Sequence, residues 1–349
     1  MKVLVLAAVA ALSVCASAQA PADSSATKKK TITLNLPSWA PRISGTIRAK
    51  AEYQTEEGEA RFEVRNARVA FDGNVHDFVL YKAEIDLSDE GNIKMLDAYA
   101  GLQATPSFLI RLGQMRVPFS IDAHRSPQHQ YFANRSFIAK QVGDVRDVGL
   151  TLGYNFKKFP LILEAGVYNG SGLTNQKNYW TKSFNFSAKA QYLFPFGLTL
   201  QASVQKIHPT GGSVYLYDGG ATLRLKRWTL EAEYLHKHYT HHDVPEVKDV
   251  DAIDAFVCYT LPMRHLFHHA NFLVRYDQMD DHSDGQLYDG HLKINDYARK
   301  RLTGGITFAF TKKINADIRL NYEKYFYSDR SLAKTSERDK AVVEFMVHF

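Results

Sequence analysis

The sequence predicts an all-β fold, a sixteen-stranded antiparallel transmembrane β-barrel, from three observations. Apolar and polar residues alternate over stretches of about ten residues, the length of a tilted strand that crosses a bilayer. There are sixteen such stretches, and an even number lets an antiparallel sheet close on itself. Short and long breaks mostly alternate along the chain. This alternation is typical of outer-membrane barrels, which have short periplasmic turns and longer external loops.

The composition agrees with a chain that is rich in strands. Aromatic residues make up 12% of the 349 residues, with 19 Tyr and 21 Phe against 11 Pro and 2 Cys. This composition excludes a disordered chain and a disulfide scaffold. After residue 18, no apolar run reaches the roughly 18 residues that a transmembrane helix needs. The net charge of +6 is spread along the chain with both signs, which argues against a nucleic-acid partner.

The first residues predict a secretory signal peptide over residues 1–18. Lys2 precedes an apolar run, and the small residues 16–18 follow it. Cleavage after Ala18 would leave Cys258 as the single cysteine of the mature chain, so no intramolecular disulfide is expected. Residues 19–41 are expected to form a periplasmic N-terminal segment, and residues 42–349 to form the transmembrane barrel.

The expected strands show the alternation one by one. In the first of them, Ile43 and Ile47 share an apolar face and Arg48 lies on the polar face. The last strand is apolar on one face up to Phe349, so it can close the barrel against the first strand. A soluble protein with such an exposed apolar edge strand would tend to aggregate. The expected strands are 42–53, 60–71, 75–87, 93–103, 108–114, 147–156, 161–168, 184–194, 198–206, 214–225, 228–238, 250–261, 269–278, 297–310, 314–326 and 339–349.

The second strand departs from strict alternation. Phe62 and Val64 set an outward phase that would place Arg68 in lipid. An Arg in that position costs about 2–4 kcal/mol at mid-depth in the bilayer. A β-bulge near Asn66 would turn both Arg65 and Arg68 inward, and we therefore expect a bulge in this strand.

Four short motifs occur in a characteristic order. Residues 41–45 read PRISG, residues 111–120 read RLGQMRVPFS, residues 146–150 read RDVGL and residues 167–172 read VYNGSG. With these motifs the chain resembles the phosphate-selective porin O and P family of Gram-negative outer membranes. The resemblance implies a usually trimeric channel of sixteen strands, in which a long third loop folds inward and narrows the pore while basic side chains conduct anions.

The break at residues 115–146 matches this third loop by position. A structureless connection of that length is uncommon unless it has a function. Guanidinium groups suit anion conduction, because their planar donor forks bind phosphate oxygens and several weak sites still let an ion leave. The expected anion-pathway residues are Arg111, Arg116, Arg125, Arg135, Lys140, Arg146, Arg48, Lys50, Arg65 and Lys82.

Two functional hypotheses follow. The first is an outer-membrane porin, a water-filled homotrimeric channel in outer-membrane lipid for passive diffusion of small anions such as phosphate or polyphosphate. The second is a plugged barrel whose external loops bind a partner or surface ligand. Residues 42–146 carry 14 basic and 14 acidic residues, so each loop arginine either lines a constriction or pairs with a lumen carboxylate. We expect no catalytic residues, no cofactor, no metal and no nucleic acid.

Overall fold

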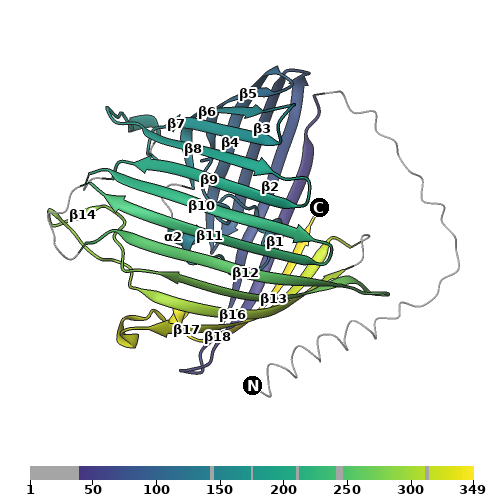
Figure 1. Ribbon diagram of the computed structural model, residues 1–349, viewed down its shortest axis with the longest axis vertical. Coiled ribbons are helices and arrows are strands. Elements are labelled where there is room, and N and C mark those ends of the chain that lie inside the picture. The colour runs from purple at the N-terminus through teal and green to yellow at the C-terminus, as the bar shows by residue number, and fades with distance from the viewer. Residues whose placement is uncertain (1–38, 142–144, 174–175, 210–211, 241–246, 311–313) are drawn as a thin grey trace, which may run out of the picture. The chain divides into compact units, whose positions relative to one another are not determined.

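A computed structural model describes residues 39–141, 145–173, 176–209, 212–240, 247–310 and 314–349, and sixteen of the strands in this part of the chain form one closed antiparallel barrel (Figure 1). Neighbours in the chain pair with one another, except that β13 pairs with β16 across the inserted hairpin β14–β15. The first strand also pairs with the last, which closes the ring. The barrel strands are β1 (Arg42–Gln54), β2 (Ala60–His76), β3 (Val79–Asp89), β4 (Asn92–Thr105), β5 (Phe108–Arg116), β6 (Arg146–Asn155), β7 (Leu161–Tyr168), β8 (Asn185–Leu193), β9 (Leu198–Ile207), β10 (Val214–Leu225), β11 (Trp228–Tyr239), β12 (Val250–Pro262), β13 (Phe267–Met279), β16 (Arg299–Phe310), β17 (Ala316–Tyr327) and β18 (Lys340–His348).

The remaining elements are short and lie in the connections. They are the strands β14 (Leu287–Tyr288) and β15 (His291–Leu292), the helix α2 (Phe137–Gln141) and the 3-10 turns η1 (Pro127–His129), η2 (Gln176–Asn178), η3 (Arg330–Leu332) and η4 (Thr335–Glu337). None of the helices in the described residues is long and apolar enough to cross a membrane. The expected signal peptide and residues 19–38 of the expected N-terminal segment lie outside the described residues.

The sixteen expected strands are confirmed, and the main difference lies in the second hairpin. The expected break at residues 72–74 is wrong, because β2 continues through it and the turn lies at Asp77 and Phe78. Gly73 has a different role within the strand. A Cβ atom at this position would lie 2.8 Å from the hydroxyl oxygen of Tyr81, so the glycine makes room for a cross-strand ring instead of marking a turn.

The expected bulge in β2 is also confirmed. Arg48 of β1 is paired with Asn66, whereas the next residue, Ala49, is paired with Val64, so Arg65 is the extra residue. Beyond the bulge the alternation resumes with the opposite phase, and Arg65 and Arg68 both line a cavity inside the barrel.

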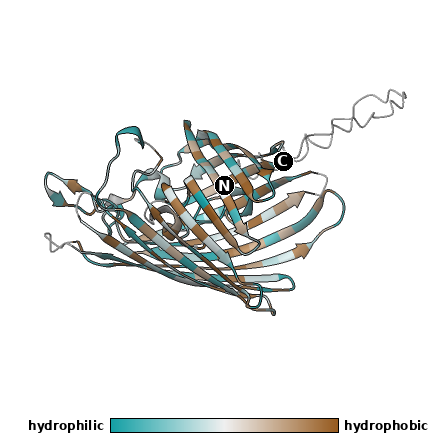
Figure 2. Cartoon of the chain, turned by 90° about the horizontal axis from the view of Figure 1, so that it is seen from above, coloured by the Kyte–Doolittle hydropathy of each residue, from teal (hydrophilic) through white to brown (hydrophobic). Residues whose placement is uncertain are grey.

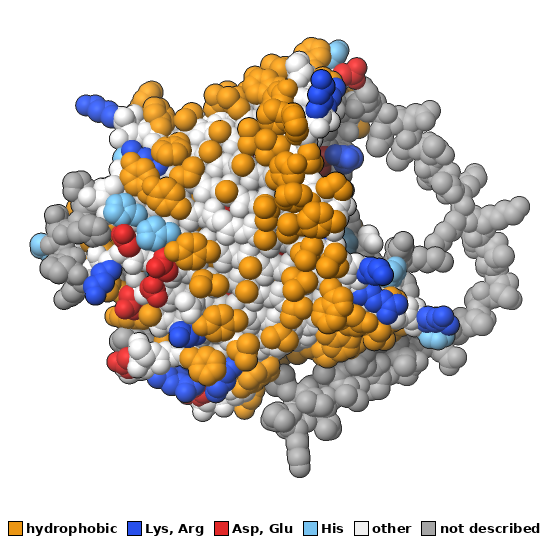
Figure 3. Space-filling model, viewed as in Figure 1, with side chains coloured by type: hydrophobic (Ala, Val, Ile, Leu, Met, Phe, Trp, Pro, Cys, Tyr) orange, Lys and Arg blue, Asp and Glu red, His pale blue; other side chains and the backbone are white. Residues whose placement is uncertain are grey.

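The barrel is apolar outside and charged inside. Phe62 on the outer face is 92% exposed, whereas Arg301 and Glu344 on the inner face are fully buried. Figure 2 shows the hydrophobic and hydrophilic residues alternating along the strands, and Figure 3 shows hydrophobic side chains spread over the outer face. Such a surface suits contact with acyl chains, and the polar groups are confined to the lumen.

The contact that closes the barrel is tight at Gly45 of β1. Its backbone exchanges two hydrogen bonds with Phe349, at 2.9 and 3.1 Å. A Cβ atom on Gly45 would lie 2.3 Å from the Phe349 ring and 2.9 Å from the backbone oxygen of Arg68. A larger residue therefore cannot fit without moving either the terminal ring or the neighbouring strand.

We expect the substitution Gly45→Val to destabilise the closed barrel by about 1–3 kcal/mol, the usual cost of overpacking. The temperature at which the compact band is lost in heat-dependent gel electrophoresis measures the effect. Gly304→Val is the matched control, because a Cβ atom there meets nothing within 4 Å. Equal transition temperatures for the two variants would contradict the importance of this contact.

Candidate functional site

The connection between β5 and β6, called here the third loop, comprises residues 117–145, and its described part lies against inward-facing side chains of distant strands. The backbone NH of Ile121 donates to Glu233 Oε1 of β11 at 2.7 Å. The backbone NH of Ala133 donates to Asn321 Oδ1 of β17 at 2.8 Å. Since both acceptors are buried on the inner face of the barrel, this part of the loop lies within the lumen.

The apolar side chains of the third loop pack against one side of the lumen. Phe137 is fully buried in a cluster that contains Leu216 of β10 and Leu235 of β11. Phe132 meets Phe256 of β12 edge to face, with 5.6 Å between ring centroids. The loop thereby occupies the lumen beside β10–β12.

Guanidinium groups on the wall hold the backbone of the loop in place. Arg48 of β1 donates to the carbonyl oxygen of Ala133 at 2.7 Å. Arg301 of β16 donates to the carbonyl oxygen of Arg135, also at 2.7 Å. Hydrogen bonds that involve a charged group are stronger than neutral ones, so the loop is held by the wall from two directions.

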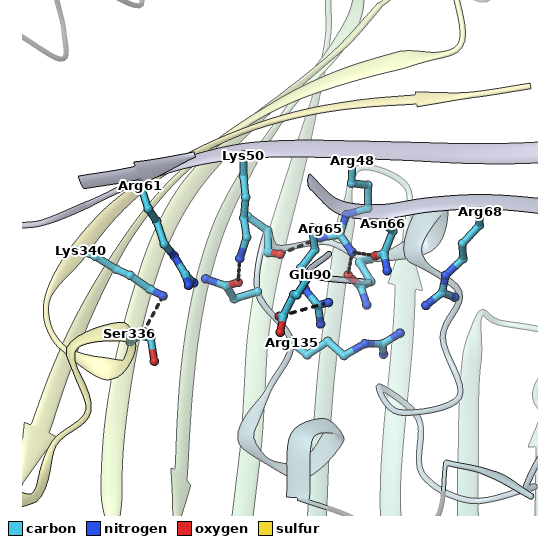
Figure 4. A pocket seen from close by; sticks show the side chains of 13 residues that line it. Arg48, Lys50, Arg61, Arg65, Asn66, Arg68, Glu90, Arg135, Ser336 and Lys340 are labelled. Atoms are coloured by element: carbon cyan, nitrogen blue, oxygen red, sulfur yellow. Dashed lines mark hydrogen bonds and ion pairs between the residues drawn. The ribbon is translucent and has the colours of Figure 1, made fainter. Parts of the chain in front are cut away.

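A cavity of about 250 Å³ lies between the third loop and the wall formed by β1 and β2 (Figure 4). We call it the basic cavity, because seven of its lining side chains are basic and only Glu90 is acidic. Figure 4 shows the side chains from β1 and β2 extending toward the loop that carries Arg135. The lining residues are Arg48, Lys50, Arg61, Arg65, Asn66, Arg68, Glu90, Gln130, Ala133, Asn134, Arg135, Ser336 and Lys340.

A second cavity of about 250 Å³ adjoins the first. The two share Arg61, Ser336 and Lys340 as lining residues. The second cavity is also lined by Glu59 from the β1–β2 connection and by Thr335 from the β17–β18 connection. The basic cavity therefore adjoins space at the end of the barrel that carries the long connections.

One buried carboxylate balances three of the cations. Glu52 lies 3.0 Å from Lys50, 2.6 Å from Arg61 and 3.1 Å from Lys340, measured between the charged atoms. Glu52 does not line the basic cavity, but it lines the adjoining second cavity together with Arg61 and Lys340. The lining of the basic cavity therefore stays positive, and the counter-charge faces the second cavity.

The other cations on the wall have carboxylate partners of the same kind. Arg48 pairs with Glu344 at 2.6 Å, and that carboxylate also accepts from Arg319. Arg68 pairs with Asp86 at 2.8 Å. Neither carboxylate lines the basic cavity, so the lining remains positive although the surrounding charges are largely paired.

Arg135 differs from the wall cations because it has no carboxylate within ion-pair distance among the described residues. Its guanidinium donates to backbone carbonyl oxygens, those of Asp122 and of Arg125, the latter at 2.7 Å. Burial, together with the nearby Arg48 and Arg68, lowers the pKa of Arg135 to about 10. Arg135 therefore keeps its charge at neutral pH and contributes a cation from the loop side of the cavity.

The structure brings together four of the ten expected pathway residues, namely Arg48, Lys50, Arg65 and Arg135. Two others are paired elsewhere on the lumen wall or in the loop. Arg111 lies 2.7 Å from Glu164. Arg125 is 2.6 Å from Glu231 and 3.0 Å from Asp122, so it anchors the loop to the wall.

The remaining four expected residues also lie outside the basic cavity or outside the described side chains. Arg146 and Lys82 share the carboxylate of Asp97, each at 2.7 Å. Arg116 donates to backbone carbonyl oxygens of the third loop. Lys140 belongs to α2, and its side chain lies outside the described part of the structure.

Three lining cations, Arg61, Arg68 and Lys340, were not among the expected pathway residues. The bulge already indicated that Arg68 faces inward. Lys340 could have been found from barrel closure, because the pairing of β1 with β18 places it opposite Gln54 and next to Lys50 and its partner Glu52. Arg61 follows on the adjacent strand, where it is the pairing partner of Glu52.

Solved structures with this architecture define the class of protein. OmpF of Salmonella typhi in complex with daunomycin has a TM-score of 0.64 at 15% identity, and the match covers 89% of this chain and 98% of that one. The anion-selective porin from Comamonas acidovorans has a TM-score of 0.61 at 13% identity, with 89% and 99% covered. The trimer form of OmpT from Vibrio cholerae has a TM-score of 0.59 at 12% identity, with 90% and 100% covered. The fold is that of the outer-membrane porins.

A family model also matches part of the chain. The model of the phosphate-selective porin O and P family matches residues 42–211, which include β1–β9 and the third loop. This match agrees with the resemblance that the motifs indicated, and the chain is an outer-membrane porin of a Gram-negative bacterium. A comparison with curated proteins gives no match.

We expect Glu233→Ala to loosen the third loop, because the Glu233 carboxylate accepts from Ser120 and from the backbone NH groups of Ile121 and Asp122. Leaving such buried donors unpaired costs about 1–3 kcal/mol each. The expected result is a lower unfolding temperature and larger current fluctuations in single-channel recordings. Glu59→Ala, at an exposed position, is the control. Quiet, unchanged currents in Glu233→Ala would contradict this anchoring role.

Proposed function

We propose that this porin is a passive channel that conducts small anions in preference to cations through the basic cavity. The observation that supports the proposal is the composition of the cavity lining, seven basic side chains against Glu90. Low-dielectric walls concentrate the field of such a lining and raise the local concentration of anions. The adjoining second cavity, which shares Arg61, Ser336 and Lys340, extends the proposed path toward the long external connections.

The arrangement of the cations suits repeated weak binding. Arg61, Arg65 and Arg68 follow one another along β2, and the rise of a strand spaces them by about 10–13 Å. A guanidinium group presents several donors to an oxyanion in one plane. The carboxylates at the wall keep each site shallow, so an anion that enters can also leave, as conduction requires.

The solute class and the assembly follow from the same site and from related proteins. Phosphate and polyphosphate are the candidate anions, since the family description names phosphate and guanidinium forks match its oxygens. One neighbour is described as an anion-selective porin, and another was solved in a trimer form. We therefore also propose that the chain functions as a homotrimer.

Neutralisation of three cavity cations tests the proposed selectivity. We expect the combined variant Arg65→Gln, Arg68→Gln and Arg135→Gln to lower the anion-to-cation permeability ratio at least about threefold. Each lost positive charge makes the electrostatic free energy of an anion in the cavity less favourable and that of a cation less unfavourable. Reversal potentials in salt gradients across planar bilayers measure this ratio.

The matched control replaces three exposed cations, Lys94, Lys293 and Lys300, by Gln and should leave the ratio unchanged. A triple cavity variant with the parent's ratio would overturn the assignment of selectivity to this cavity. If the parent protein carries no current at all, the plugged barrel with ligand-binding external loops is the better explanation.

Removing a carboxylate that pairs with the cavity cations should raise the anion-to-cation permeability ratio. Glu52→Gln removes the negative charge shared by Lys50, Arg61 and Lys340 while it keeps the size of the side chain. We expect a higher anion-to-cation ratio, or a longer dwell time of phosphate in the current trace, since the cations lose one of their two counter-charges and keep only Glu63 or Glu323. A lower anion-to-cation permeability ratio in this variant would show that the carboxylates beside the cavity do not control its ion selectivity.

A further inference from the structure

The short turns at one end of the barrel carry exposed cations. Lys157 and Lys158 lie in the β6–β7 turn, Lys226 and Arg227 in the β10–β11 turn, and Arg264 in the β12–β13 turn. We call these five residues the basic rim. In outer-membrane barrels the short turns face the periplasm, so the basic rim lies at the periplasmic end.

The basic rim has no counter-charge of its own. The four consecutive turn segments 155–160, 193–197, 225–228 and 261–268 contain neither Asp nor Glu. Among the described residues, none of the five cations has a carboxylate within ion-pair distance, in contrast to the wall cations of the lumen. Five unpaired positive charges on one half of the rim favour an anionic partner from outside the chain.

Exposed aromatic rings lie next to the same turns. The rings of Trp228 and Tyr259 are 4.7 Å apart, and those of Phe194 and Phe196 are 5.3 Å apart, measured between centroids. Phe159, beside Lys158, is also exposed. Aromatic rings of this kind sit at the level of the lipid headgroups. Lys158 directly precedes Phe159 and Arg227 directly precedes Trp228, so these cations lie beside the rings, near the level of the lipid phosphates.

The opposite end has a different charge pattern. The external ends of β11–β13 expose the carboxylates of Asp249, Asp251 and Asp280, beside histidines of β11. Figure 3 shows acidic, histidine and basic side chains together at the end of the strands that carries the long connections. The external end therefore carries charges of both signs, whereas the four turn segments of the basic rim carry cations alone.

We propose that the basic rim binds the phosphate groups of anionic phospholipids in the periplasmic leaflet of the outer membrane. Each lysine or arginine near an anionic membrane surface strengthens binding by about fivefold. The aliphatic parts of these side chains can extend along the apolar surface while the charged ends reach the phosphates. The basic rim thus selects anionic lipids around one half of the barrel. This binding does not involve the conducting cavity.

Trp228 provides a direct probe of this binding. The chain has 3 Trp residues, so replacing Trp39 and Trp180 by Phe leaves Trp228 within the rim as the single fluorophore. The full-length protein is placed in phosphatidylcholine vesicles that contain either brominated phosphatidylglycerol or brominated phosphatidylcholine, which quench tryptophan on contact. We expect phosphatidylglycerol to be preferred at Trp228 at least about fivefold at low salt, and the preference to fall as salt is raised.

Replacing all five rim cations by Gln should bring the preference close to one and leave conductance unchanged. The control replaces five exposed cations at the external end of the barrel by Gln and should keep the preference; they are Lys94 and Lys300 near the ends of β4 and β16, and Lys293, Arg330 and Lys334 in the connections. If the five-residue variant does not fold, Lys226→Gln with Arg227→Gln, which directly precede Trp228, gives the same test. Equal quenching by the two lipids in the parent protein, or a preference that survives in the rim variants, would overturn the proposal.

Discussion

The structure depends on one constraint, that backbone NH and carbonyl groups in a bilayer must bond within the protein. A sheet satisfies this constraint only when it has no open edge, so β1 pairs with both β2 and β18. Closure then decides where every side chain points, because alternate residues face lipid and lumen. The charges of the chain are concentrated in the lumen, where Arg301 is completely buried between Asp277 and Glu323.

The buried charged side chains of the lumen need hydrogen-bond partners, and the backbone of the third loop supplies some of these partners. Its backbone carbonyl groups accept hydrogen bonds from wall arginines such as Arg48 and Arg301, and its backbone NH groups are satisfied by Glu233 and Asn321. The loop therefore completes the polar network of the wall as well as filling space. Because its apolar residues pack beside β10–β12, the cavity remains on the side of β1 and β2, where the lining is basic.

Positive and negative charges are nearly equal in number around this cavity, so selectivity must arise from placement. Glu52 pairs with Lys50, Arg61 and Lys340, and the bulge at Arg65 brings Arg68 to the inner face that Arg61 and Arg65 already share. A single extra residue in β2 thus adds one cation to the lining. On the outer surface, charges of both signs lie at the external end, and the basic rim lies at the periplasmic end.

The sequence by itself determined the barrel, its strand count and the bulge near Asn66, because alternation with period two and the alternating loop lengths are local patterns along the chain. Its short motifs indicated the family resemblance. It also placed Arg48, Lys50, Arg65 and Arg135 in the lumen. Only the tertiary structure decided that Arg111 and Arg125 are paired away from the cavity and that Lys340 joins it. The physical reason is that the ion-pair partner of a lumen side chain comes from strands that closure brings next to it. Glu52 and Lys340, for example, lie on the paired strands β1 and β18 but are 288 residues apart in the chain.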